Sequence, residues 1–233
     1  MDFNTAVQIP SHESIEEFAQ EITSEILEKC EGTLLYRITE HEFPYAPHTE
    51  QLEIYNTALK NASPKSGDVL NTMHYNRRRA LIEESALDYL RENNFIIING
   101  FINFRLEEYK NELRKLCHNA ADELSAMREY DEFLNMLRFF VSVQTPKENT
   151  VHVVRVGDAL RIFNKWHKDI TDFYASEFAF SPEDFTHEDI ALSALITISP
   201  KRIIIHDNKE NDKLYETIES VFSNVEYKEV VTK

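Results

Sequence analysis

The stretch VHVVRVGDALRIF, from Val151 to Phe163, decides the fold class of this chain. Two runs rich in β-branched residues flank Gly157-Asp158. This pair suits a two-residue hairpin turn, because glycine adopts a positive φ without strain. We therefore predict an antiparallel hairpin with strands near 151–156 and 159–164.

The sequence after the hairpin alternates between helix and strand signals. The tripeptide SPE at 181–183 suits the start of a helix, and Thr186 with Asp189 has the spacing of a capping box. We expect this helix to end by Pro200. The elements expected after it are a strand at RIIIHD (202–207), a helix at DKLYETIESVF (212–222) and a strand at VEYKEVV (225–231).

The sequence before the hairpin, residues 66–145, is patterned for helices. Residues 69–91 contain no glycine or proline, so nothing in them interrupts a helix. Ile82, Ala86 and Tyr89 recur at helical spacing and mark one face.

An apolar run, Ile96–Ile98, interrupts this helical pattern. Periodicity leaves open whether the run forms a short buried strand or a buried turn of helix. Beyond it we expect one helix over about 101–127 and another from about 128, ending before Pro146.

The first part of the chain, residues 1–62, reads as a small acidic α/β unit. A strand is predicted at FNTAVQIP (3–10), then a helix that ends at Gly32, then a second strand at TLLYRIT (33–39), parallel to the first. The helix has an apolar face of Ile15, Phe18, Ile22 and Ile26, and its start is capped by Ser11 or Ser14.

These patterns together predict an α+β fold. NASPKSGDV (61–69) has the composition of a linker, so the predicted segments are 1–62, 66–145 and 150–233. Whether they form one composite domain, and whether the strands at the two ends share one sheet, stays open at this point.

The composition is that of a globular protein with a strong negative charge. Of 233 residues, 42% are hydrophobic, and the formal net charge is −16. Residues 1–60 carry 12 acids against 3 bases and would repel a phosphate backbone, so nucleic-acid binding is disfavoured. No membrane span or secretory signal is expected, and Cys30 and Cys117 read as buried thiols, which together predict a cytoplasmic protein.

Three consecutive arginines in this acidic chain, Arg77, Arg78 and Arg79, are candidates for contact with a partner or an anion. On a helix they spread over about 200°, so they cannot all face one way. Glu83 lies four residues after Arg79 and permits one local ion pair, and another arginine could reach the acidic first segment. Neutralisation within the chain, a protein partner and an anionic ligand therefore stay open.

Aromatic side chains accompany other arginines along the predicted helices. Phe101, Phe104, Phe139 and Phe140 have the helical spacing of core residues, although stacking platforms for single strands use the same residue types. Arg105 is a fourth contact candidate, with a salt bridge to a neighbouring helix as its alternative role.

Catalytic, cofactor and metal motifs are not found in the sequence. Only four glycines occur, so no phosphate-binding loop can be written. Cys117 and His118 are adjacent on a predicted helix and point about 100° apart, which separates them as a catalytic pair. Six groups could still converge on a metal: His152, His167, Asp169, His187, Asp189 and His206. Because none has compact ligand spacing, we predict no catalytic residue, no metal site and no cofactor.

Several ordered blocks resemble a known family. GFINFRLEEY (100–109), REYDEFLNMLRFFVSVQ (128–144), VHVV (151–154) and EDIALSALITISPKRIIIH (188–206) together resemble the YtxC-like family, whose members are described as sporulation proteins of spore-forming bacteria. The resemblance implies a role in endospore formation, or expression during it. It implies no enzymatic activity, cofactor or catalytic residue.

The sequence therefore predicts a cytoplasmic, sporulation-associated protein with an accessory or interaction role, with a protein as the expected partner and its oligomeric state open. The alternative is a metal-dependent hydrolase or a nucleic-acid processing protein that uses the scattered His and Asp groups. Convergence of three or more of those groups in one pocket would favour the alternative. A flat apolar patch rimmed by charge would favour the interaction protein.

Overall fold

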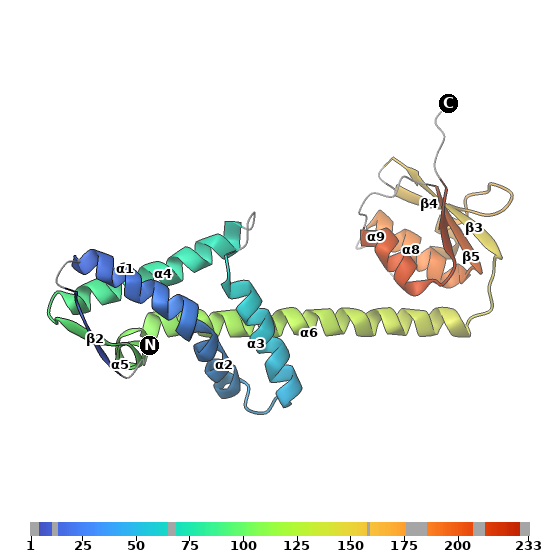
Figure 1. The fold of residues 1–233 in the computed structure, drawn as a ribbon. Helices are drawn as coiled ribbons and strands as arrows, with labels where there is room; N and C mark the ends of the chain where they lie inside the picture. The colour runs from blue at the N-terminus through green and yellow to red at the C-terminus, as the bar shows by residue number, and fades with distance from the viewer. Residues whose placement is uncertain are drawn as a thin grey trace. The chain divides into compact units, whose positions relative to one another are not determined.

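The computed structural model describes residues 5–10, 14–64, 69–157, 159–175, 186–206 and 213–228. It confirms the α+β class, with helices predominating and two small sheets (Figure 1). The chain divides into two compact units, Met1–Met127 (unit 1) and Arg128–Lys233 (unit 2), each with its own hydrophobic core. The boundary falls inside one long helix, α6 (Glu107–Val143). The division of the sequence into 1–62, 66–145 and 150–233 stays a prediction about domains.

Unit 1 begins with a short strand, β1 (Ala6–Gln8), and a capped helix, α1 (Ile15–Glu25). Ser14 caps α1: its Oγ accepts from the Glu17 N–H, and the Glu17 carboxylate accepts from the Ser14 N–H. This capping box confirms one of the two predicted serines, and Ser11 lies outside the described residues.

The helical run continues where a strand was predicted, so the predicted strand at 33–39 and the helix end at Gly32 are both wrong. A π-helical turn over Ile26–Cys30 joins α1 to α2 (Glu31–Glu42). Leu35 and Thr39 are both buried one turn apart, which is helical spacing, and the Thr39 hydroxyl donates to the Leu35 carbonyl at 2.9 Å. Gly32 lies at a contact with α3 (His48–Ala62).

The strand that does pair with β1 lies much later in the sequence. β2 (Phe95–Ile97) pairs with β1 antiparallel, with Val7 opposite Ile96, so the predicted parallel pairing inside residues 1–62 is wrong. α4 (Val69–Leu90) precedes β2, and α5 (Ile98–Arg105) follows it directly. The apolar run Ile96–Ile98 is therefore a strand that passes into a helix, and both readings of it hold in turn.

Residues 101–145 do not form the two helices that were predicted for them, one over about 101–127 and one from about 128. The chain breaks at Leu106 and then runs without interruption through α6, so the predicted break near 127 is wrong. The predicted linker at 61–69 falls partly on α3, which ends at Ala62, and partly on residues 65–68, which lie outside the described part. The core of unit 1 joins helices α1 to α6, as Figure 1 shows for α1 beside α4.

The hairpin predicted near residues 151–156 and 159–164 is present in unit 2. β3 (Thr150–Val156) and β4 (Ala159–Phe163) pair antiparallel, and Gly157 between them has φ 64°. β5 (Arg202–His206) pairs parallel with β3, and β6 (Val225–Tyr227) pairs parallel with β5. The resulting sheet has the order β4-β3-β5-β6, and β1 and β2 form a separate sheet, which answers the question left open above.

The helices of unit 2 are α7 (Thr171–Ala175), α8 (His187–Ile198) and α9 (Lys213–Val221). The predicted capping box at Thr186 and Asp189 is confirmed, and α8 ends at Ser199, whose φ is 47°. The predicted helix start at 181–183 lies outside the described residues. Alternate side chains of β3 and β4 enter the core with α8, α9 and part of α6. The buried residues of β3 and β4 are Val151, Val153, Leu160 and Ile162, and Ile203 and Ile205 of β5 lie in the same core.

Candidate functional site

The three consecutive arginines of α4 fan out, as their helical positions predict. The Nε of Arg77 lies 3.3 Å from an oxygen of Glu112 on α6. The Nε of Arg79 lies 3.9 Å from an oxygen of Glu83, which is the local pair expected from their spacing. Both arginines are substantially exposed, so these surface pairs contribute little to stability.

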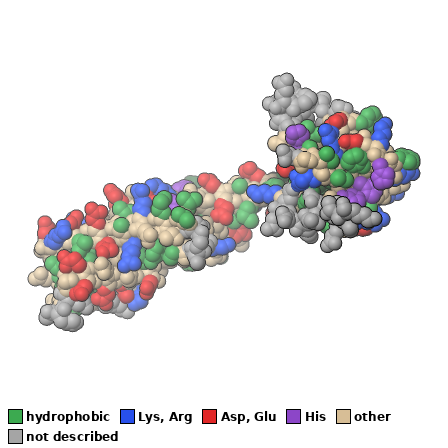
Figure 2. All heavy atoms as spheres, turned by 90° about the horizontal axis from the view of Figure 1, so that it is seen from above, with side chains coloured by type: hydrophobic (Ala, Val, Ile, Leu, Met, Phe, Trp, Pro, Cys, Tyr) green, Lys and Arg blue, Asp and Glu red, His purple; other side chains and the backbone are tan. Residues whose placement is uncertain are grey.

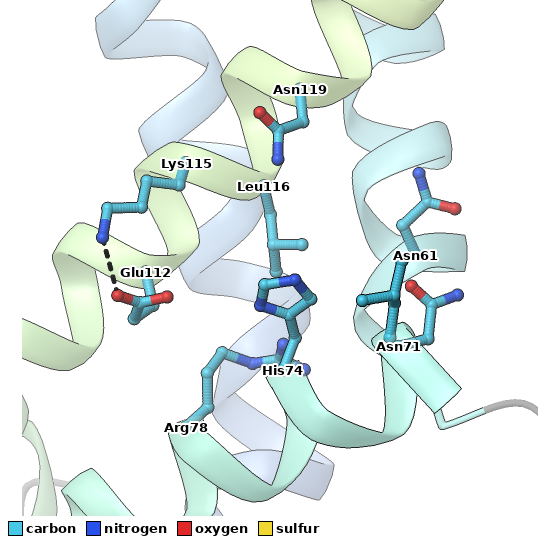
Figure 3. Close-up of a pocket in the computed structure, with 9 residues that line it drawn as sticks. Asn61, Asn71, His74, Arg78, Glu112, Lys115, Leu116 and Asn119 are labelled. Atoms are coloured by element: carbon cyan, nitrogen blue, oxygen red, sulfur yellow. Dashed lines mark hydrogen bonds and ion pairs between the residues drawn. The ribbon is translucent and has the colours of Figure 1, made fainter. Parts of the chain in front are cut away.

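The middle arginine is buried in unit 1 (Figure 3), with only 1% of its surface exposed. Arg78 donates from Nε and Nη2 to the two carboxylate oxygens of Glu31, at 3.1 and 3.2 Å. Its Nη2 also donates to the backbone carbonyl of Ala62. The hydroxyl of Tyr109 donates to Glu31 at 2.9 Å. Side chains and backbone from α2, α3, α4 and α6 therefore meet at the buried pair of Arg78 and Glu31.

The phenol in this network acts as a hydrogen-bond donor. Burial raises the pKa of the Tyr109 hydroxyl, and the neighbouring Glu31 carboxylate raises it further. Tyr109 thus keeps its proton and completes the hydrogen bonding of Glu31. Tyr109 recurs in the sequence at helical spacing with Leu106 and Leu113, and a buried hydroxyl needs a partner, so this signal was available.

The fourth contact candidate, Arg105, lies on a shallow apolar depression. Its guanidinium sits 5.7 Å from the centroid of the Tyr89 ring, a cation–π arrangement. Within the described ranges Arg105 makes this contact in place of the salt bridge expected as its alternative role. The depression is lined by Tyr89, Ile97, Gly100, Phe101, Phe104 and Arg105.

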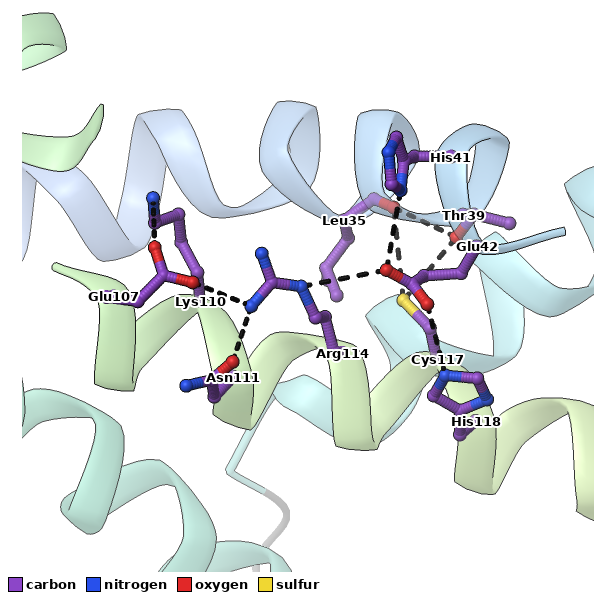
Figure 4. Close-up of polar contacts among 10 residues, drawn as sticks. All are labelled: Leu35, Thr39, His41, Glu42, Glu107, Lys110, Asn111, Arg114, Cys117 and His118. Carbon is purple, nitrogen blue, oxygen red and sulfur yellow. Dashed lines mark hydrogen bonds and ion pairs between the residues drawn. The ribbon is translucent and has the colours of Figure 1, made fainter. Parts of the chain in front are cut away.

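A second polar cluster joins α2 to α6 (Figure 4). Glu42 lies 3.6 Å from Arg114 and 3.4 Å from His118, both on α6. Cys117, next to His118 in sequence, points elsewhere: its sulfur lies 3.5 Å from the Thr39 hydroxyl. The predicted separation of Cys117 and His118 is confirmed. Burial raises the pKa of the Cys117 thiol, which favours an inert core thiol over a nucleophile.

Histidine side chains gather on the surface of unit 2 (Figure 2). The Nδ1 of His152 and the Nε2 of His206 are 2.8 Å apart, and the His167 ring centroid lies 6.2 Å from that of His152. Asp169 instead hydrogen-bonds to Thr171, at the start of α7. Three of the six scattered groups thus approach one another. Across the described ranges, no group of three or more His, Cys, Asp or Glu is arranged to hold a metal ion, so these three histidines give no support to the metal-dependent alternative.

The part of α6 in unit 2 is apolar on two sides. Leu134 and Leu137 are buried in the core of unit 2. Five large apolar side chains lie within about 120° on the other side of the helix and are exposed. We call them the α6 face: Phe133, Met136, Phe139, Phe140 and Val143. Charged residues border the face, with Asp131, Glu132 and Arg138 exposed on the same helix.

The α6 face corrects part of the sequence interpretation. Phe101 is buried, as its helical spacing predicted. Phe139 and Phe140 were expected in a core, but they are 65% and 49% exposed. Phe104, also expected in a core, is 85% exposed. Helical spacing groups side chains on a face but does not say whether anything covers that face.

These features define a two-unit α+β protein with a buried ion-pair network in one unit and an exposed apolar helix face in the other. The chain belongs to the YtxC-like family, whose model matches residues 16–225. It is similar to the "Uncharacterized protein YtxC" of Bacillus subtilis (strain 168), with 23% identity over 216 residues, which cover 89% of this chain and 75% of that protein. No solved structure matches the chain. Of the helices in the described part, none has the length and apolarity to cross a membrane.

Proposed function

We propose that this chain is a cytoplasmic, sporulation-associated accessory protein that binds another protein through the α6 face. The observation that carries the proposal is the row Phe133, Met136, Phe140 and Val143, exposed on a helix whose other side is already buried. A helix with apolar side chains on two sides is normally covered on both of them, so a second contact is expected here.

The spacing of the face suits a helix that lies in a groove of a partner. Such helices use anchors at positions i, i+3 or i+4, and i+7. Met136, Phe140 and Val143 have this spacing, and so do Phe133, Met136 and Phe140. Burying one such side chain contributes roughly 1.5–3 kcal/mol, so a few anchors can support a specific complex.

An accessory role, rather than catalysis, is supported by how the charged groups are used. Glu31 and Arg78 bind each other in a buried pair, and Glu42 binds Arg114 and His118. These are structural contacts between helices. The link to sporulation is supported by what the resemblance to the YtxC-like family implies.

Site-specific photo-crosslinking in sporulating cells tests the proposal. A photoreactive phenylalanine analogue replaces Phe140 in one strain and Phe104 in another. Phe104 is the matched control, because it is an exposed phenylalanine of unit 1 that does not belong to the α6 face. We expect one discrete crosslinked protein band from position 140 that is absent from position 104.

The crosslinked species also identifies the type of partner. Mass spectrometry separates a different protein from a second copy of this chain. If the crosslinked protein is a second copy of this chain, the α6 face serves self-assembly and not an accessory role. The same pattern of bands from both positions, or no band from position 140, would contradict the proposal.

A further inference from the structure

A pocket of about 240 Å³ opens between α4 and α6, beside the end of α3 (Figure 3). On α4 it is lined by Asn71, His74 and Arg78, and on α6 by Glu112, Lys115, Leu116 and Asn119, with Leu70 and Asn61 at the side. The polar residues of each helix are spaced three or four apart, so each set forms one row on one helical face. Two polar rows thus face each other where two packed helices would ordinarily place apolar side chains.

The wall of this pocket contains a buried hydrogen-bond donor for which no described residue supplies an acceptor. The Nε and Nη2 of Arg78 are bound to Glu31 and Ala62, but its buried Nη1 has no hydrogen-bond partner among the described residues. In Figure 3 the guanidinium extends toward His74, another residue of the pocket wall. Buried donors in proteins are nearly always satisfied, so an acceptor is expected in the pocket.

The charges at the pocket favour an acceptor that is an anion. Lys115 lies 2.8 Å and Arg77 3.3 Å from the same oxygen of Glu112. Burial acts to raise the pKa of Glu112, but its contacts with Lys115 and Arg77 outweigh burial and lower the pKa, so Glu112 is ionised. Of the residues that line the pocket, Arg78 and Lys115 are cationic and Glu112 is anionic, in a chain whose net charge is −16.

We propose that this pocket binds a small oxyanion, a carboxylate or a phosphate group, with one oxygen accepting from Nη1 of Arg78. Lys115 and the side-chain amide of Asn119 supply further donors from α6. The volume suits a small polar molecule. The site lies in unit 1 and does not depend on the function proposed for the α6 face in unit 2.

Nuclear magnetic resonance titration of the full chain tests the site. The probes are inorganic phosphate, acetate and, as the ionic-strength control, chloride, and the side-chain N–H signals of Arg78 are the readout. We expect saturable shifts with at least one oxyanion and none with chloride. Saturation by phosphate alone assigns a phosphate group, and saturation by acetate alone assigns a carboxylate.

Variants separate specific binding from general charge attraction. Lys115→Ala and Asn119→Leu remove pocket donors and leave Arg78 in place, and each should weaken binding by about fivefold or more. Arg91→Ala removes an exposed cation of unit 1 that does not line the pocket, and it should leave the affinity unchanged. Shifts that fail to saturate with both oxyanions, or that chloride reproduces, would overturn the proposal. Equal weakening by Arg91→Ala would also overturn it.

Discussion

Arg78 and Glu31 form a bidentate ion pair in the core of unit 1, although 47 positions separate them in the sequence. The pair ties the start of α2 to α4, and Tyr109 of α6 donates to the same carboxylate. Removing either charge of such a buried pair is destabilising, because the other charge is left buried without a counter-charge.

Replacing Arg78 with methionine should therefore destabilise unit 1 strongly. We expect a loss of about 3–5 kcal/mol in the free energy of unfolding, because Glu31 is left as an unpaired buried charge. Arg77→Met and Arg79→Met are matched controls on the same helix, and each exposed pair should cost less than about 1 kcal/mol. Denaturant unfolding followed by circular dichroism measures the loss. The fluorescence of Trp166, the single tryptophan, reports separately on unit 2.

The double variant Glu31→Leu/Arg78→Met gives the complementary result. Because it removes both charges, it should be more stable than Arg78→Met alone. If the three arginine variants lose equal stability, or the double variant is the least stable of all, then the buried pair does not have the role described for it.

We expect the positive φ at position 157 to be the sole reason that glycine is required there. Its φ is 64°, and a Cβ built there would meet nothing within 4 Å. Gly157→Val should then cost roughly 1–2 kcal/mol in unit 2, because a β-branched residue resists this φ. Gly157→Asn should cost clearly less, since asparagine tolerates the left-handed region. Unfolding monitored by Trp166 fluorescence compares the two variants, and equal midpoints would refute a requirement for positive φ.

The stability of unit 2 should fall as the solution becomes acidic. Burial lowers the pKa of His152 below its ordinary value of 6.5, with further contributions from His206 and His167. Burial likewise lowers the pKa of His206, with Lys228 as the next cause. The unfolded chain then binds protons more readily than the folded one. The free energy of unfolding of unit 2 therefore keeps its full value, as far as these histidines are concerned, above about pH 6.5. It declines as the pH drops from there toward the folded-state pKa values.

Unfolding midpoints of unit 2 at about pH 7.5 and pH 5 check this dependence. His206→Gln should flatten it, because the His152–His206 contact is lost. His187→Gln is the control, since His187 lies at the start of α8 and outside the histidine cluster, and this variant should keep the dependence. A midpoint that rises toward pH 5 in the unchanged chain would contradict the sign.

Local signals in the sequence were sufficient for most of unit 2. The turn at Gly157 and the capping box at Thr186 each involve residues close in sequence, and both are present. The strand predicted at 33–39 failed because its β-branched residues also fit a helix when Leu35 and Thr39 face a core. Tertiary packing decided that segment, and no local pattern reports it.

The candidate site was predicted only in part. Arg78 lies four residues before Ile82 in the buried row of α4. Helical periodicity alone could therefore have identified it as the inward-facing arginine. Its partner Glu31 could not be found in that way, because the pairing depends on how α2 meets α4. The exposure of Phe139 and Phe140 was hidden for a similar reason: an apolar helix face looks the same in sequence whether it is covered or not.

Counting heat-resistant spores tests the central claim about the α6 face most directly. The native host would carry the wild-type chain, a deletion, Phe133→Ser/Phe140→Ser, or the control Phe104→Ser, with the amount of each protein checked in the cells. The account predicts that the double variant accumulates as a folded protein and gives the spore count of the deletion, well below that of the wild type and of Phe104→Ser. A wild-type count from the double variant, or from the deletion itself, would contradict it.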